Sequence, residues 1–127
     1  MSDASEQRSD PRFACLGQVA IDRAPGVRPL AGRLIDLSLG GCRIAPGIPG
    51  DFPLNTEIEF VLERADTVFR IRGSVKSIGR TTGEIGIQFI AIPMRGKVAL
   101  QEMIEELRQS KAPDRNLTAR VSFYNAA

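Results

Sequence analysis

The sequence has no histidine and only two cysteines, Cys15 and Cys42, among its 127 residues. Without an imidazole, the chain lacks the usual general base, the catalytic triads that depend on it and the commonest zinc ligand. Two thiols are too few for a thiolate metal site or a disulfide scaffold, so we expect both to be reduced and packed in the core or against each other. These absences predict a protein that is not an enzyme, with no catalytic residues, no metal and no cofactor.

Long apolar runs and a signal peptide are also missing. No stretch approaches the ~18 consecutive apolar residues of a membrane span. The first six residues contain neither the basic nor the apolar region of an export signal. Together with the sparse cysteine, this predicts a cytoplasmic protein without membrane insertion.

The chain carries no large excess of positive charge, because its net charge is only +2. That value is too small for sequence-independent binding along a nucleic-acid polymer. A barrel for single strands would also need stacking aromatics in a basic groove, and the chain has six Phe, one Tyr and no Trp. Fourteen of the seventeen cationic residues are arginine, whose planar donor fork matches phosphate oxygens and the O6/N7 edge of guanine. Solubility or coding bias explains any single arginine equally well.

The sequence does contain a series of short segments in which apolar and polar residues alternate, separated by turns rich in Gly and Pro. This pattern predicts a mainly β fold, a six-stranded antiparallel β-barrel. Apolar residues at helical spacing after Pro93 then predict a C-terminal α-helix that covers the barrel. The strands are expected at about residues 13–21, 30–37, 42–45, 56–63, 68–78 and 84–90, and the apolar helix face comprises Val98, Leu100, Met103, Ile104 and Leu107.

The clearest register is that of the fourth and fifth expected strands. If residues 64–67 form their connection, Phe60 faces Ile71 on the inner side and Glu59 faces Arg72 on the outer side. Apolar pairs inside and opposite charges outside suit a half-buried antiparallel ribbon. The outer cations of this hairpin are therefore expected to form a solvated surface.

The chain divides into three parts by composition. Residues 1–12 are polar and form an N-terminal arm that we expect to be flexible, because Pro11 blocks a helix there. Residues 13–110 contain the barrel and the helix. Residues 111–127 are mostly polar and are expected to be a flexible tail.

Two arginines four residues apart, Arg8 and Arg12, end the N-terminal arm. Their Cα atoms are separated by at most ~13 Å of extended chain. Two guanidinium forks on such an arm could close around a polyanionic ligand from different directions. Alone the pair is a weak signal, because this spacing arises readily by chance in an arginine-rich chain.

A second motif, Asp36-Leu-Ser38-Leu-Gly40-Gly41, follows the second expected strand. Alternation places Asp36 and Ser38 on one side, and the two glycines permit positive φ and the close approach of a flat ring. Such a corner suits the N1–H and N2–H₂ edge of guanine, with glycine N–H groups available to oxygen acceptors. The alternative is a plain turn between strands, in which Asp36 and Ser38 only satisfy backbone groups.

With these two motifs in this order, the sequence resembles the PilZ domain family, which binds the bacterial second messenger cyclic di-GMP. Residues 32–44, 73–75 and 85–89 follow the family pattern as well, and the likeness covers about residues 6–108. The resemblance implies a six-stranded antiparallel barrel with a C-terminal helix, in agreement with the alternation.

The resemblance also implies roles for five residues. Arg8 and Arg12 would hold guanine edges and phosphates of the dinucleotide. Asp36 and Ser38 would hydrogen-bond a guanine or its ribose, and Gly41 would give clearance and an N–H group.

Two neighbours of these residues, Gln7 and Gly40, are candidates for additional contacts. The chain would then be a small single-domain receptor that passes the cyclic di-GMP signal to an unidentified downstream protein. The alternative is an interaction adaptor with the same barrel that does not depend on nucleotide.

Overall fold

The computed structural model describes residues 13–22, 26–47, 53–64, 67–79, 81–109 and 117–123. Within these ranges the chain forms seven strands and one helix. In chain order they are β1 (Phe13–Ile21), β2 (Leu30–Leu37), β3 (Gly41–Pro46), β4 (Glu57–Arg64), β5 (Thr67–Ile78), β6 (Ile85–Ala91), α2 (Met94–Gln109) and β7 (Leu117–Phe123).

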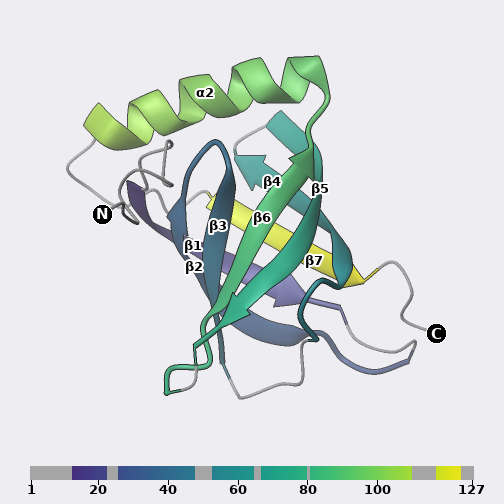
Figure 1. Ribbon diagram of the computed structural model, residues 1–127. Coiled ribbons are helices and arrows are strands. Elements are labelled where there is room, and N and C mark those ends of the chain that lie inside the picture. The colour runs from purple at the N-terminus through teal and green to yellow at the C-terminus, as the bar shows by residue number, and fades with distance from the viewer. Residues whose placement is uncertain are drawn as a thin grey trace, which may run out of the picture.

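The strands form a closed barrel in the order β1-β2-β3-β6-β5-β4-β7, and α2 lies across one end of it (Figure 1). All neighbouring strands are antiparallel except β1 and β7, which run parallel where the barrel closes. Closure gives every strand a partner on both sides, so no backbone edge is left open. The predicted fold class, a β-barrel with a C-terminal helix, is confirmed.

The β4–β5 hairpin has the register that the alternation predicts. Phe60 pairs with Ile71 and Glu59 with Arg72 across the two strands. Phe60 and Ile71 are buried, whereas the Arg72 side chain is half exposed and lies 2.5 Å from Glu57 Oε1. The outer face of the hairpin is thus a solvated surface of ion pairs, as expected.

β7 corrects the expectation of six strands and, for residues 117–123, that of a flexible tail. Leu117, Ala119 and Val121 are buried in the barrel and alternate with exposed Thr118 and Arg120. The strand pairs with both β4 and β1, which would otherwise be open edges. The other tail residues, 111–116 and 124–127, lie outside the described residues, as does the N-terminal arm.

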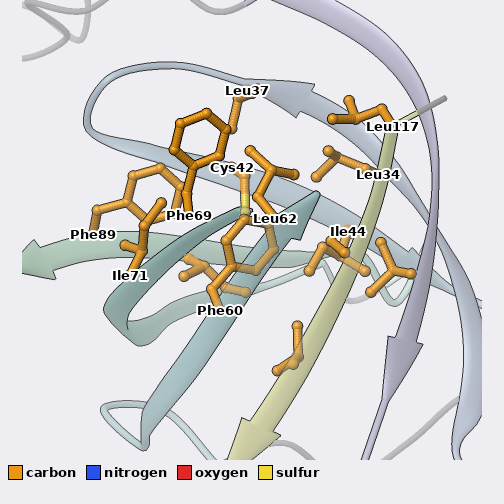
Figure 2. Close-up of a cluster of buried hydrophobic side chains, with 14 of the residues drawn as sticks. Leu34, Leu37, Cys42, Ile44, Phe60, Leu62, Phe69, Ile71, Phe89 and Leu117 are labelled. Atoms are coloured by element: carbon orange, nitrogen blue, oxygen red, sulfur yellow. The ribbon is translucent and has the colours of Figure 1, made fainter. Parts of the chain in front are cut away.

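The core fills the barrel with inward-facing apolar side chains of all seven strands (Figure 2). Phe60 and Phe89 are both buried in this core, with ring centroids 5.6 Å apart. Full burial of a side chain of this size contributes about 1.5–3 kcal/mol. Cys42 is buried in the core, as predicted, and the side chain of Cys15 lies outside the described residues.

α2 closes one end of the core with a single apolar face. Four of its five predicted core residues are buried, but Val98 is 49% exposed and does not belong to that face. Val98 differs because the buried positions follow an i, i+3, i+4, i+7 spacing from Leu100, which excludes it. In the described part of the chain, no helix combines the length and apolar character that crossing a membrane requires.

Candidate functional site

The second motif forms the turn between β2 and β3. Gly40 O accepts a hydrogen bond from Phe89 N in β6, shortly before the chain enters α2. The turn therefore lies at the end of the barrel that α2 covers (Figure 1). Asp36, Ser38, Gly40 and Gly41 are brought together there, whereas Gln7, Arg8 and Arg12 lie outside the described residues.

Asp36 is a buried carboxylate at the end of β2, with only 6% of its surface exposed. The pairing of β2 with β3 shifts between Leu34 and Asp36, so the strict alternation of β2 is interrupted there. As a result Leu37 takes the core-facing position opposite Cys42, whereas Asp36 stands opposite the half-exposed Arg43.

The two oxygens of the Asp36 carboxylate differ in their contacts. Oδ2 accepts a hydrogen bond of 2.8 Å from Nε of Arg43. Oδ1 is buried without any hydrogen-bond partner, and it is the one such side-chain atom in the described part of the chain. Because buried polar atoms are almost always paired, this open acceptor sets Asp36 apart from the other buried polar side chains of the described barrel.

Arg43 links the site to the β5–β6 turn. It stands directly opposite Asp36 on β3, and its Nη1 lies 3.5 Å from Oε1 of Glu84. The side chain of Arg43 is 42% exposed, against 8% for that of Asp36. Our sequence reasoning missed Arg43 and Glu84, although opposite charges at facing positions of β2 and β3 are the same signal that identified Glu59 and Arg72.

Ser38 organises the turn through its hydroxyl group. Oγ accepts hydrogen bonds from Gly40 N at 3.2 Å and Gly41 N at 3.1 Å, and donates to Gly41 O at 3.2 Å. A hydroxyl has one donor and two acceptor positions, so all three are used. The expectation that the glycine N–H groups are available to a ligand is therefore wrong for this structure.

Gly41 is required by the packing of the barrel. A Cβ at this position would overlap the carbonyl oxygen of Ile87 on the adjacent β6. The predicted reason, a positive φ, is wrong, because the glycines with positive φ in the described residues are Gly26 and Gly83. The absence of a side chain at Gly41 therefore serves the close approach of β3 to β6.

No group of three His, Cys, Asp or Glu side chains within the described ranges is arranged to hold a metal ion. The β2–β3 turn offers a hydrogen-bond acceptor, Asp36 Oδ1, beside the half-exposed guanidinium group of Arg43.

The family profile of the PilZ domain matches residues 6–106. The chain belongs to the PilZ domain family. The match includes both motifs, from Arg8 to Gly41, and ends within α2, so that β7 lies beyond it.

Among solved structures, the PilZ fold of this chain is similar to the PilZ domain with cyclic di-GMP of YcgR from Escherichia coli. The TM-score is 0.61 at 17% sequence identity, over 81% of this chain and 92% of the YcgR chain. At this identity the likeness shows the PilZ fold alone. A comparison with curated proteins gives no match.

Proposed function

We propose that this PilZ domain is a receptor for cyclic di-GMP, and that the dinucleotide binds on the outer barrel surface around Asp36–Gly41. The observation that carries the proposal is the buried, unpartnered Oδ1 of Asp36. A buried acceptor that is left open in the ligand-free protein is what a ligand with a matching donor requires.

The chemistry of Oδ1 selects the base. Guanine presents N1–H and N2–H₂ as adjacent donors, either of which satisfies Oδ1. On the same edge adenine has a single donor, N6–H₂, beside its N1 acceptor, so an adenine held in the position of guanine would turn N1 towards Oδ1 and leave two acceptors facing each other. A site with a buried polar group discriminates strongly, because the wrong ligand leaves that group unpaired.

The N-terminal arm supplies the contacts to phosphate in this proposal. Ala14 pairs with Asp36 and Phe13 with Leu37, so β1 begins beside the carboxylate. Arg12 directly precedes Phe13 in the chain, at a Cα separation of 3.8 Å. This connectivity supports a role for Arg12 and Arg8 in binding the phosphates and guanine edges from above the barrel surface, as bidentate charge-assisted donors.

Ser38, Gly40 and Gly41 contribute to the proposed site by fixing the turn. The three hydrogen bonds of the Ser38 hydroxyl hold the segment that follows Asp36. A direct contact from Ser38 or a glycine N–H to guanine or ribose would replace one of these bonds.

The proposed output is a change in the N-terminal arm. When Arg8 and Arg12 engage the ligand, the arm closes over it and presents a new surface to a partner protein, while the barrel stays rigid. Cyclic di-GMP acts here as a ligand that is bound and released unchanged. Because two guanidinium groups meet two phosphates, the affinity should fall as salt is added.

Isothermal titration and thermal melting with cyclic di-GMP test the proposal. We expect the wild type to bind and its melting midpoint to rise, because a ligand of the native state stabilises it by mass action. Arg8→Ala and Arg12→Ala should each weaken binding about tenfold or more. Arg70→Ala is the control, since it removes one exposed, ion-paired charge from β5. A wild type that ignores cyclic di-GMP at high micromolar concentration would favour the nucleotide-independent adaptor instead.

A further inference from the structure

We propose that Arg43 is a positioning residue of the nucleotide site, which holds the Asp36 carboxylate by Oδ2 so that Oδ1 is presented to the guanine. Glu84 holds Arg43 in turn. This inference rests on the proposed function, because it assigns a role to Arg43 at the same site.

The Asp36 carboxylate needs such a constraint. The terminal torsion of an aspartate side chain has a broad, roughly two-fold preference, so packing alone does not decide where each oxygen points. The bond of 2.8 Å from Arg43 Nε fixes Oδ2. With Oδ2 fixed, Oδ1 points to a position where it has no hydrogen-bond partner among the described residues.

The contact of Arg43 with Asp36 uses a single nitrogen. An arginine can bind both oxygens of a carboxylate with two parallel N–H groups, and that arrangement would consume Oδ1. Here only Nε reaches Asp36, while Nη1 faces Glu84 at 3.5 Å. The guanidinium group is thereby held between two carboxylates and leaves Oδ1 open.

Glu84 lies directly before β6, and two hydrogen bonds of its backbone hold it there. Its N–H donates to Thr82 Oγ1 at 3.1 Å, and its carbonyl oxygen accepts from Gly79 N at 2.8 Å. Its side chain is 27% exposed, so water screens its contact with Arg43 only in part. A chain of contacts therefore runs from the β5–β6 turn through Arg43 to Asp36.

The test is a double-mutant cycle on binding, measured by calorimetry with cyclic di-GMP. The four proteins are the wild type, Arg43→Ala, Asp36→Ala and the double variant. We expect Arg43→Ala to weaken binding about tenfold, the effect of losing a charge-assisted hydrogen bond. In the Asp36→Ala background the same substitution should have almost no effect, because Arg43 acts only through Asp36.

Two outcomes would overturn the inference. Additive losses would show that Arg43 contacts the ligand itself, and an unchanged affinity of Arg43→Ala would show that Asp36 needs no orientation. Selectivity gives a second readout, because Arg43→Ala should reduce the preference for cyclic di-GMP over cyclic di-AMP, which a general loss of stability would not do.

Matched control variants distinguish the positioning role of Arg43 from a general effect of removing a positive charge or of destabilising the fold. Arg120→Ala also removes an arginine that bonds a carboxylate, Asp22, but on β7, across the barrel from β3. It should leave the affinity unchanged.

If Arg43→Ala does not fold, Arg43→Lys replaces it in the cycle. The loss of affinity should then be smaller, and it should again disappear in the Asp36→Ala background. A wild type that fails to bind would refute the proposed function, whereas normal binding by the Arg43 variants would refute the inference alone.

Discussion

Removing either partner of the Asp36–Arg43 pair should change the stability of the ligand-free protein by unequal amounts. Arg43→Ala leaves a carboxylate that is 8% exposed with no partner on either oxygen among the described residues. Asp36→Ala removes both the bonded oxygen and the unpartnered one, and leaves Arg43, whose side chain is 42% exposed, to be hydrated.

The size of each stability change follows from what happens to the two oxygens of the Asp36 carboxylate. A hydrogen bond to a charged group contributes about 1.5–3 kcal/mol, and the exposure of Arg43 favours the lower end, about 1.5 kcal/mol, as the loss in Arg43→Ala. Asp36→Ala loses the same bond but removes Oδ1, whose burial without a partner costs about 1–3 kcal/mol. These two effects nearly cancel, so the change in Asp36→Ala should stay within about 1 kcal/mol. The double variant should resemble Asp36→Ala.

Urea unfolding without nucleotide measures these differences. For a domain of this size, a loss of about 1.5 kcal/mol lowers the unfolding midpoint by roughly 0.5–1.5 M. We expect that shift for Arg43→Ala and a much smaller one for Asp36→Ala. If Asp36→Ala is the more damaging of the two, Asp36 is a structural turn residue, and its open oxygen is no sign of a ligand.

Two further pairs of variants test the barrel that supports the site. Gly41→Ala should destabilise by about 1–3 kcal/mol, because the new methyl group overlaps Ile87 O. Gly96→Ala in α2 should change stability by less than about 1 kcal/mol, since the gain in helix propensity is offset in part by a close contact of its Cβ with Ile92 Cγ2 at 3.3 Å. Leu117→Ala should cost about 2–5 kcal/mol, because Leu117 is fully buried, whereas Thr118→Ala on the exposed side of β7 should change stability by less than about 0.5 kcal/mol. Equal effects at Leu117 and Thr118, measured by urea unfolding, would contradict the assignment of β7 to the barrel.

The sequence predicts local pairing well and distant pairing poorly. The register of β4 with β5 could be derived because both strands alternate and a short connection fixes which residues face each other. β7 pairs in parallel with β1, whose paired residues lie 100 positions earlier in the chain, and no turn links the two strands. Its alternation was present in the sequence, but the small Ala119 weakens the apolar signal of the buried face.

The candidate site was predicted in position and only partly in chemistry. The motif located Asp36, but its place opposite Arg43 depends on the shifted pairing of β2 with β3, and period-two alternation cannot reveal such a shift. The roles expected for the glycine N–H groups were wrong because the Ser38 hydroxyl occupies both. That arrangement depends on the side-chain rotamer of Ser38, which the spacing of the motif does not specify.

In the proposed receptor, the geometry of the β2–β3 turn assigns recognition of the base and binding of the phosphates to different parts of the chain. Ser38 is saturated by its own turn and Gly41 lies against β6, so neither can move without loss of barrel contacts. The one unsatisfied buried side-chain acceptor in the described barrel is Asp36 Oδ1, and a carboxylate oxygen attracts donors and repels phosphate. The rigid β2–β3 turn can therefore recognise a base, but the charge of a dinucleotide must be met by cations outside it. Those that the family motif provides are Arg8 and Arg12, joined to the barrel beside Asp36 by the pairing of β1 with β2. In the proposed receptor, base selectivity would thus reside in the β2–β3 turn, and affinity for phosphate in Arg8 and Arg12.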